Sequence, residues 1–417
     1  MRHALLGLFL LSLFCPLSIQ AAAPVKKQQQ APAKKKTVPH KTALVAAHKA
    51  PLRSSATYRT GGLVASRTAT RVSRPVPRVY YSPWTEKSFG EPTVGDNEDG
   101  EDLLIRKAAV DALGPFNGSV VVVDPQTGRI LTIVNQKLAF RSGYTPCSTI
   151  KLVTSLAALK EGLIGHSTPV RISKRLQMDM TEALAISNNS YFAKLGTDLG
   201  FDRVKSYAQL YGLGEKAGWE IPEENAGTIM QLPAAHGGVG MMTSFGNGFH
   251  VTPLELVALV SAIANHGTLY YLQYPRTTEG LTSFQPKVKR LLDIEPLISE
   301  IRPGMQGAVE YGTARRAGFD ASDQIFGKTG TCSDYQTPTT HLGWFGAFNE
   351  PGPWGKKLAV VVMLTGGKQV NGPVASGVAG AFYRNLAKLQ QQLESKSKTA
   401  APERGWIAGF LSGEKTN

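Results

Sequence analysis

The chain has 417 residues, of which 46 are Lys or Arg and 31 are Asp or Glu, so its formal net charge is +15. Hydrophobic residues make up 42% and charged residues 18%, which excludes wholly disordered, collagen-like and disulfide-dense proteins. The length allows one large domain or two ordinary ones with an ample core.

The basic residues are concentrated near the N-terminus. Between Pro24 and Pro83 there are thirteen Lys or Arg and no Asp or Glu, and the rest of the chain is nearly neutral. This stretch has few large apolar residues and no sustained periodicity, so we expect residues 23–100 to form a disordered basic linker. The linker is either a solvated tether or, over residues 24–83, an electrostatic arm for an anionic membrane surface or wall polymer.

The first residues have the pattern of an export signal. A short basic start is followed by the apolar run Ala4–Cys15 and by the small residues Ala21–Ala23. We expect residues 1–22 to be a cleaved signal peptide, with an uncleaved membrane anchor as the alternative. Export to the periplasm or cell envelope argues against nucleic acid as the partner of the basic linker.

The elements predicted after the linker begin with strands and end with strands and a helix. In chain order they are a helix at 103–113, a hairpin of strands 119–123 and 130–134, helices at 150–159 and 252–265, strands at 325–331, 342–348 and 358–364, and a helix at 374–392. This order predicts the α+β fold class: a mostly antiparallel five-stranded sheet flanked by helices, with a helical subdomain insert. The folded domain is expected over residues 101–395, followed by a C-terminal tail over 396–417.

Three short motifs carry the candidate chemistry, and the first is Ser148-x-x-Lys151. It lies where a helix is predicted to begin, so the Lys151 amine is able to reach the Ser148 hydroxyl and act as its base. A helix N-terminus also directs amide hydrogens at developing negative charge. The spacing alone is weak evidence, because it occurs by chance in most chains of this size.

The second and third motifs are also ambiguous when taken alone. In Ser187-Asn188-Asn189, the serine is able to relay a proton and Asn189 to bind a substrate amide, but a plain helix–loop junction explains the motif as well. The third motif is Lys328-Thr329-Gly330-Thr331, at the end of a predicted strand. Strand alternation places its two threonines on one face, able to hold a carboxylate, and the glycine lets a ligand approach the backbone. A strand followed by a turn is the structural alternative.

Together and in this order, the three motifs form the signature of active-site-serine penicillin-binding proteins and β-lactamases. The flanking sequence also resembles penicillin-binding transpeptidase domains, over roughly Leu103 to Leu389. The segments that carry this resemblance are Ser119–Val134, Ser190–Gly196, Tyr211–Gly218, Gly246–Gly248, Val251–Leu256, Ile263–Gly267, Trp344–Gly346 and Val360–Gly367.

The resemblance implies a peptidoglycan D,D-transpeptidase. Such an enzyme forms an acyl-enzyme from D-Ala-D-Ala stem peptides and transfers it to an acceptor amine, or to water as a D,D-carboxypeptidase. The implied ligands are peptidoglycan stem peptides and β-lactam antibiotics, and neither a metal nor an organic cofactor is implied. A stand-alone transpeptidase domain on a tether is expected, because only the basic stretch separates the signal from the domain.

The resemblance also implies a role for each motif residue. Ser148 is the nucleophile and Lys151 its base, while Ser187 and Lys328 pass a proton to the leaving amine. Asn189 holds the donor amide and Thr329 the terminal carboxylate. The backbone amides of Ser148 and Thr331 form the oxyanion hole, with Gly330 between the two threonines.

The cysteines depart from the usual family pattern. Cys147 directly precedes one implied oxyanion-hole amide, and Cys332 directly follows the other. A pair at these motif-relative positions resembles that of class A serine carbapenemases, and the implied geometry brings the two within the range that a disulfide needs. We therefore predict a Cys147–Cys332 disulfide, with two small buried thiols as the alternative.

Two other functions remain open from the sequence. A serine β-lactamase shares the fold, but no clear class A acidic deacylation motif is present, and the second motif ends in Asn where class D enzymes favour Val. A non-catalytic envelope-binding protein would use the basic arm, but the export signal and the three intact motifs argue against it.

Overall fold

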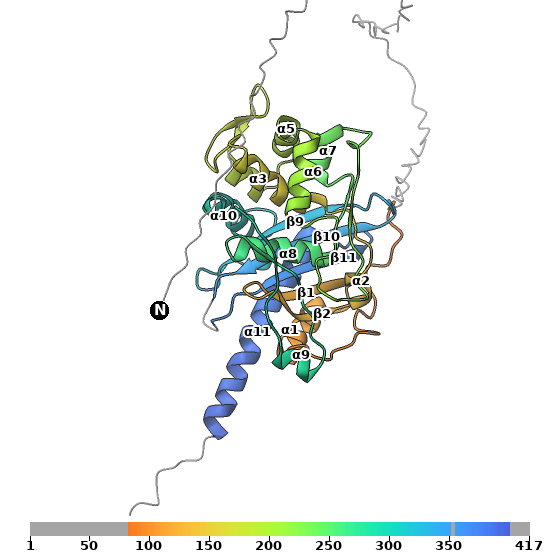
Figure 1. Ribbon diagram of the computed structural model, residues 1–417, viewed down its shortest axis with the longest axis vertical. Coiled ribbons are helices and arrows are strands. Elements are labelled where there is room, and N and C mark those ends of the chain that lie inside the picture. The colour runs from red at the N-terminus through yellow and green to blue at the C-terminus, as the bar shows by residue number, and fades with distance from the viewer. Residues whose placement is uncertain (1–81, 352–354, 401–417) are drawn as a thin grey trace, which may run out of the picture. The chain divides into compact units, whose positions relative to one another are not determined.

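A five-stranded antiparallel sheet lies at the centre of the fold, with strands in the order β2-β1-β11-β10-β9 (Figure 1). The computed structural model describes residues 82–351 and 355–400, so the expected signal peptide, most of the expected basic linker and residues 401–417 lie outside the described part. The strands are β1 (Gly118–Asp124), β2 (Arg129–Val134), β9 (Ile325–Ser333), β10 (His341–Asn349) and β11 (Ala359–Gly366).

Helices cover both faces of this sheet. On one face, α1 (Leu103–Leu113) and α11 (Gly372–Ala400) pack together over the strands. On the other face, α8 (Pro253–Ala264) lies across β1, β10 and β11. Because both faces are covered, the valine run of β1 is fully buried on its two sides, as expected for a central strand.

Helix α8 is the core helix of the second face. Thr252 caps its N-terminus in a capping box with Glu255, as the sequence pattern suggests, and every residue of the helix is buried. A helix that is buried all round requires packing on every side. Its buried residues belong to the same core cluster as the buried residues of the helical insert.

Most of the helical insert stands above the β9 edge of the sheet in Figure 1. It contains α3 (Lys151–Lys160), α4 (Met180–Ala185), α5 (Asn189–Leu199), α6 (Phe201–Leu210), α7 (Gly238–Phe245) and α10 (Glu295–Glu310). The smaller helical elements are α2 (Gln136–Ala139), α9 (Thr278–Thr282) and the 3₁₀ turns Cys147–Ile150 and Arg315–Ala317. Three short strand pairs complete the described part: β3 (Val170–Arg171) with β4 (Gln177–Met178), β5 (Thr228–Ile229) with β6 (Phe249–His250), and β7 (Thr268–Tyr270) with β8 (Val288–Leu291). Within the described ranges, every helix is too short or too polar to cross a membrane.

The predicted α+β class, with a five-stranded antiparallel sheet and a helical insert, is confirmed. The start of the folded domain differs from the expected residue 101. Residues 82–100 form a strap that packs on the domain: the Trp84 indole donates to Ser333 Oγ over 2.8 Å and packs at a tilt against the His341 ring, with 4.2 Å between centroids. The Thr85 amide donates to the Thr339 carbonyl. The polar composition of the strap concealed this packing.

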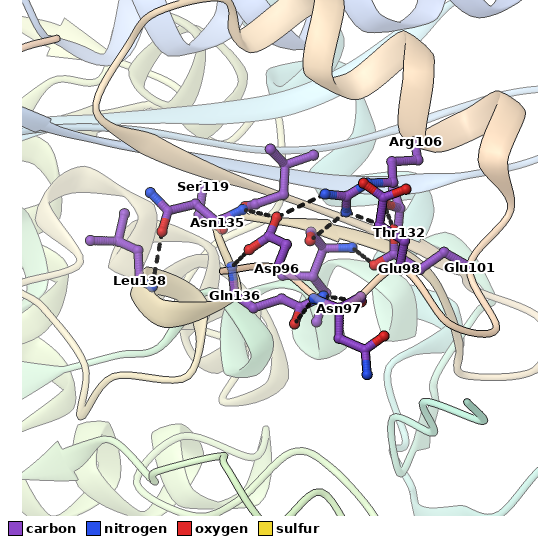
Figure 2. A network of polar contacts seen from close by, with 12 residues as sticks. Asp96, Asn97, Glu98, Glu101, Arg106, Ser119, Thr132, Asn135, Gln136 and Leu138 are labelled. Carbon is purple, nitrogen blue, oxygen red and sulfur yellow. Dashed lines mark hydrogen bonds and ion pairs between the residues drawn. The ribbon is translucent and has the colours of Figure 1, made fainter. Parts of the chain in front are cut away.

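A buried ion cluster anchors the second half of the strap (Figure 2). The Arg106 guanidinium, on α1, contacts Asp96 at 3.0 Å, Glu98 at 2.9 Å and Glu101 at 2.8 Å. The Asp96 carboxylate also accepts hydrogen bonds from the backbone amides of Asn135 and Gln136. One cation thus fixes the strap to α1 and to the end of β2.

Loss of this cation is expected to destabilise the domain. Arg106→Ala should lower the free energy of unfolding by about 3–5 kcal/mol, because the buried carboxylates of Asp96 and Glu101 lose their counter-ion. Urea denaturation followed by circular dichroism measures the change. The matched control is Lys107→Ala, which removes an exposed pair with Asp111 and should cost about 0.5 kcal/mol or less. Equal losses of unfolding free energy in the two variants would contradict the role of Arg106 as the counter-ion of the buried carboxylates.

Candidate active site

Ser148 lies in a 3₁₀ turn, Cys147–Ile150, and α3 begins only at Lys151. The sequence predicted one continuous helix start here. The turn is sharp because Cys147 has a left-handed backbone, with φ of 52°, which a non-glycine residue adopts only when its surroundings enforce it. The Ser148 hydroxyl is half-buried and donates to the Ser244 carbonyl over 3.4 Å.

The Lys151 amine joins the first two motifs. It lies 2.8 Å from the Ser187 carbonyl, 2.9 Å from Ser187 Oγ and 2.6 Å from Asn189 Oδ1. Among the described residues, no hydrogen bond links it to Ser148. The predicted pair therefore shares a site, but the amine is directed at the second motif.

The surroundings of Lys151 favour a neutral amine. Its side chain is fully buried, and burial, followed by the nearby charge of Lys328, lowers its pKa to about 5. The amine donates to three oxygen atoms, the Ser187 carbonyl, Ser187 Oγ and Asn189 Oδ1. The low pKa therefore follows from burial and from the charge of Lys328, and not from these contacts.

The second motif is shaped by a local turn. Ser187 has a left-handed backbone, with φ of 59°, and the Asn188 side chain caps α5 by accepting from the Tyr191 amide over 2.9 Å. Asn188 is therefore structural, as the helix–loop interpretation holds. The same turn directs Ser187 Oγ and Asn189 Oδ1 at Lys151.

The third motif lies on β9, at the edge of the sheet. Lys328 is fully buried, its amine donates to the Thr329 carbonyl over 3.0 Å, and burial lowers its pKa to about 7. Gly330 faces the nucleophile turn: a Cβ there would lie 2.9 Å from the Pro146 carbonyl oxygen and 3.2 Å from Cys147 Cβ. The packing of β9 on the Ser148 turn thus requires this glycine, and the ligand approach expected from the sequence stays a prediction.

The two threonines of β9 share the other face of the strand, as alternation predicts. The amide of Gly372, the first residue of α11, donates to Thr331 Oγ1 over 2.8 Å. Thr329 Oγ1 lies 2.6 Å from the hydroxyl of Thr313.

Thr313 is a site residue that the sequence reasoning missed. Its amide donates to the Ala185 carbonyl over 3.1 Å, so it links the segment before Ser187 to Thr329 on β9. The adjacent Gly312 has no room for a Cβ, which would lie 2.2 Å from the same carbonyl oxygen. The short Gly-Thr-Ala sequence carries no pattern that marks a site, and only its place after a long helix could have drawn attention to it.

A disulfide joins Cys147 to Cys332, with Cα atoms 5.6 Å apart, at the positions that the sequence singled out. It connects the nucleophile turn to the end of β9. A second, polar link runs in parallel: the Asp334 carboxylate accepts from the amide and hydroxyl of Thr145, at 3.1 and 2.9 Å. The Trp344 indole also donates to the Thr145 carbonyl over 3.0 Å.

The arrangement places a serine hydroxyl, a neutral buried amine and a second serine in one site between the insert and β9. This set is suited to nucleophilic acyl transfer, with proton transfer through the amine and Ser187.

Comparison with known proteins agrees with this chemistry. Residues 118–388 match the family model of the penicillin-binding protein transpeptidase domain. The chain is 29% identical to stage V sporulation protein D of Bacillus subtilis over 315 residues, 66% of this chain and 48% of the relative. It is 25% identical to peptidoglycan D,D-transpeptidase PbpA of Mycolicibacterium smegmatis over 354 residues, 68% of this chain and 69% of the relative. The chain spans about half the length of the first of these.

A solved structure shows the same fold. Penicillin-binding protein A of Mycobacterium tuberculosis superposes with a TM-score of 0.59 at 22% identity, covering 69% of this chain and 81% of that chain. The same protein as an imipenem acyl-enzyme complex gives a TM-score of 0.57 at 22% identity, covering 69% of this chain and 79% of that chain.

Removal of the disulfide is expected to affect stability. Replacing Cys147 and Cys332 together by Ala should lower the free energy of unfolding by about 2–5 kcal/mol, because the bridge closes a loop of 185 residues in the unfolded chain. Urea denaturation of the double variant and of the wild type measures this loss. Wild type unfolded in reductant is the control and should match the variant; equal stability of oxidised wild type and double variant would refute the role.

Proposed function

The chain belongs to the penicillin-binding protein transpeptidase family, and from this premise we propose that it is a peptidoglycan D,D-transpeptidase acting on D-Ala-D-Ala stem peptides. The observation that carries the proposal is the buried Lys151 amine, with a pKa lowered to about 5, in contact with Ser187 and Asn189 and three residues after Ser148. A base of this kind is what a serine nucleophile requires at neutral pH.

The first half of the proposed reaction forms an acyl-enzyme. Ser148 Oγ attacks the carbonyl carbon of the penultimate D-alanine, and its proton passes to the neutral amine of Lys151. The negative charge that develops on the carbonyl oxygen is stabilised by the backbone amides of Ser148 and Thr331, each such donor being worth about 3–4 kcal/mol. The disulfide between the adjacent cysteines supports this pairing of amides.

The second half releases one amino acid and transfers the rest. The peptide C–N bond breaks, and the leaving amine of D-alanine receives a proton through Ser187 and Lys328. The acceptor amine then attacks the ester and gives its proton back along the same route; water in its place gives carboxypeptidase activity. Asn189 holds the donor amide, and Thr329 holds the terminal carboxylate with its hydroxyl oriented by Thr313.

The cell envelope is the compartment that fits this activity. The relatives include proteins named for peptidoglycan transpeptidation, and the disulfide fits an oxidising space. We propose that residues 1–22 direct export and that the basic residues 24–83 bind an anionic membrane or wall polymer, with no nucleic-acid partner.

Labelling with a fluorescent penicillin tests the nucleophile. Wild type should form a long-lived covalent adduct, and Ser148→Ala should form none, because β-lactams mimic the donor peptide and acylate the same serine. Gel fluorescence after denaturation measures the adduct. Ser155→Ala, a buried serine on the adjoining helix α3, is the control and should still label.

The outcome also separates the two alternatives. If the adduct disappears rapidly and each protein molecule hydrolyses many penicillin molecules, the protein is a β-lactamase. If wild type never labels, while its fold is intact, a non-catalytic envelope-binding protein becomes the better explanation.

The pH dependence of acylation tests the neutral amine. On the acid side of the profile, the acylation rate should fall about tenfold per pH unit below pH 5 and level off by about pH 6. The reason is that protonated Lys151 has no lone pair to accept the serine proton. Stopped-flow fluorescence with the labelled penicillin measures the rate between pH 4 and 9. A rate that still rises tenfold per unit between pH 8 and 9 would show an ordinary lysine and contradict the assignment. Lys151→Arg, which stays charged, should be inactive throughout.

A further inference from the structure

A cavity of about 180 Å³ lies at the end of the sheet, where the strap, the segment after α2 and the β9–β10 connection meet. It is separate from the three motifs, none of whose residues lines it. Its lining includes Glu86 from the strap, Arg141 and Tyr144 from the segment after α2, and Asp334 and Thr340 from the β9–β10 connection.

The floor of this cavity is polar and buried. Tyr144 and Asp334 are each 5% exposed. The Asp334 oxygens are occupied by Thr145 and by the Thr337 amide, so this carboxylate already has donors. The Tyr144 hydroxyl, in contrast, is buried and has no close, well-aligned hydrogen bond to a described residue; the Arg141 side chain is the only donor group that acts on it there. Buried polar groups of this kind are nearly always satisfied in native proteins, so the hydroxyl indicates a polar guest.

The rim of the cavity carries one charge of each sign. Glu86 and Arg141 are both exposed, and neither forms an ion pair with another described residue. The Arg141 guanidinium lies 5.6 Å from the centre of the Tyr144 ring, and its hydrogen bond and charge act on the Tyr144 hydroxyl, so the two groups face the cavity together. An anion alone would face the acidic groups Glu86 and Asp334, and a cation alone would face Arg141. A ligand with both charges matches both sides of the rim.

We propose that this cavity binds a small α-amino acid as a zwitterion, with its carboxylate at Arg141 and Tyr144 and its ammonium at Glu86. The cavity of about 180 Å³ is smaller than the roughly 300 Å³ at which sites for drug-sized ligands begin, and this suits a ligand as small as glycine or alanine. The D-alanine released by the reaction is one source of such a ligand, and only this choice of source rests on the proposed function.

The ligand would lie next to the segment that leads into the nucleophile turn. Asp334, in the floor, holds Thr145, three residues before Ser148. Binding is therefore expected to stabilise the β9–β10 connection and to raise the melting temperature of the whole protein.

Isothermal titration calorimetry of the full chain tests the proposal, with glycine, L-alanine and D-alanine as probes. At least one should bind saturably, with a dissociation constant on the order of 1 mM, as expected for a ligand with few atoms. N-acetyl-D-alanine and D-alanine methyl ester each lack one charge and should bind at least about tenfold more weakly. Absence of saturable binding by all three amino acids, or equal binding of the blocked forms, overturns the proposal.

Paired variants locate the site. Arg141→Gln and Glu86→Gln should each weaken binding at least about tenfold, and Tyr144→Phe should weaken it without changing the cavity volume. The controls Lys137→Gln and Glu91→Gln remove like charges from the same segments outside the cavity and should bind as wild type does. Equal weakening in the controls, or no weakening in the three cavity variants, overturns the assignment.

A last experiment distinguishes binding in this cavity from binding in the catalytic site, where an amino acid is able to act as acceptor. Wild type acylated at Ser148 by penicillin should bind the amino acid as before, and loss of binding on acylation would overturn the proposal. If wild type is never acylated, the proposed function fails, while the paired variants still decide whether the cavity binds the zwitterion.

Discussion

The burial of two lysine amines is the constraint on which the site depends. Lys151 on α3 and Lys328 on β9 are both inaccessible to solvent, and burial lowers the pKa of each, to about 5 and about 7. A charged amine in such surroundings costs several kcal/mol, and a second like charge adds to that cost. The neutral amine of Lys151 therefore exists only when α3, the turn at Ser187 and β9 have closed on it. The packing of three separate elements thus creates the neutral amine that we propose as the base.

That packing is close enough to explain the small residues around it. β9 approaches the Ser148 turn so tightly that Gly330 has no room for a Cβ, and Gly246 is similarly limited by Pro146. Left-handed backbones at Cys147 and Ser187 direct side chains that a regular helix would turn elsewhere. The site therefore combines rigid helices and strands with two strained turns, which is how a scaffold holds reactive groups at fixed positions.

Much of this could be predicted from the sequence, because it depends on local pattern. Four successive valines in β1, the capping box of α8 and the spacing of the three motifs all have short-range signatures, and the α+β fold with a five-stranded sheet is as expected. The packing of the strap over residues 82–100 could not be predicted, because Asp96 and Glu98 are held by Arg106, a cation on another element. Thr313 was missed for the same reason: its contact with Thr329 is tertiary, and the Gly-Thr-Ala sequence alone has no pattern. The direction of the Lys151 amine toward Ser187 also follows from packing and not from helical spacing.

The strap and the disulfide act on the same part of the sheet, and this explains why the folded part begins well before α1. The end of β9 is an edge, and an edge strand has a neighbour on one side only. Cys332 ties this end to the nucleophile turn, and the next residue, Ser333, accepts a hydrogen bond from the Trp84 indole. Asp334 then holds Thr145. Three consecutive residues of the edge strand and its connection are thus fixed by three different partners. Because the Thr331 amide lies directly before them, its position depends on this short run, and the strap is as much a part of the site's support as the sheet itself.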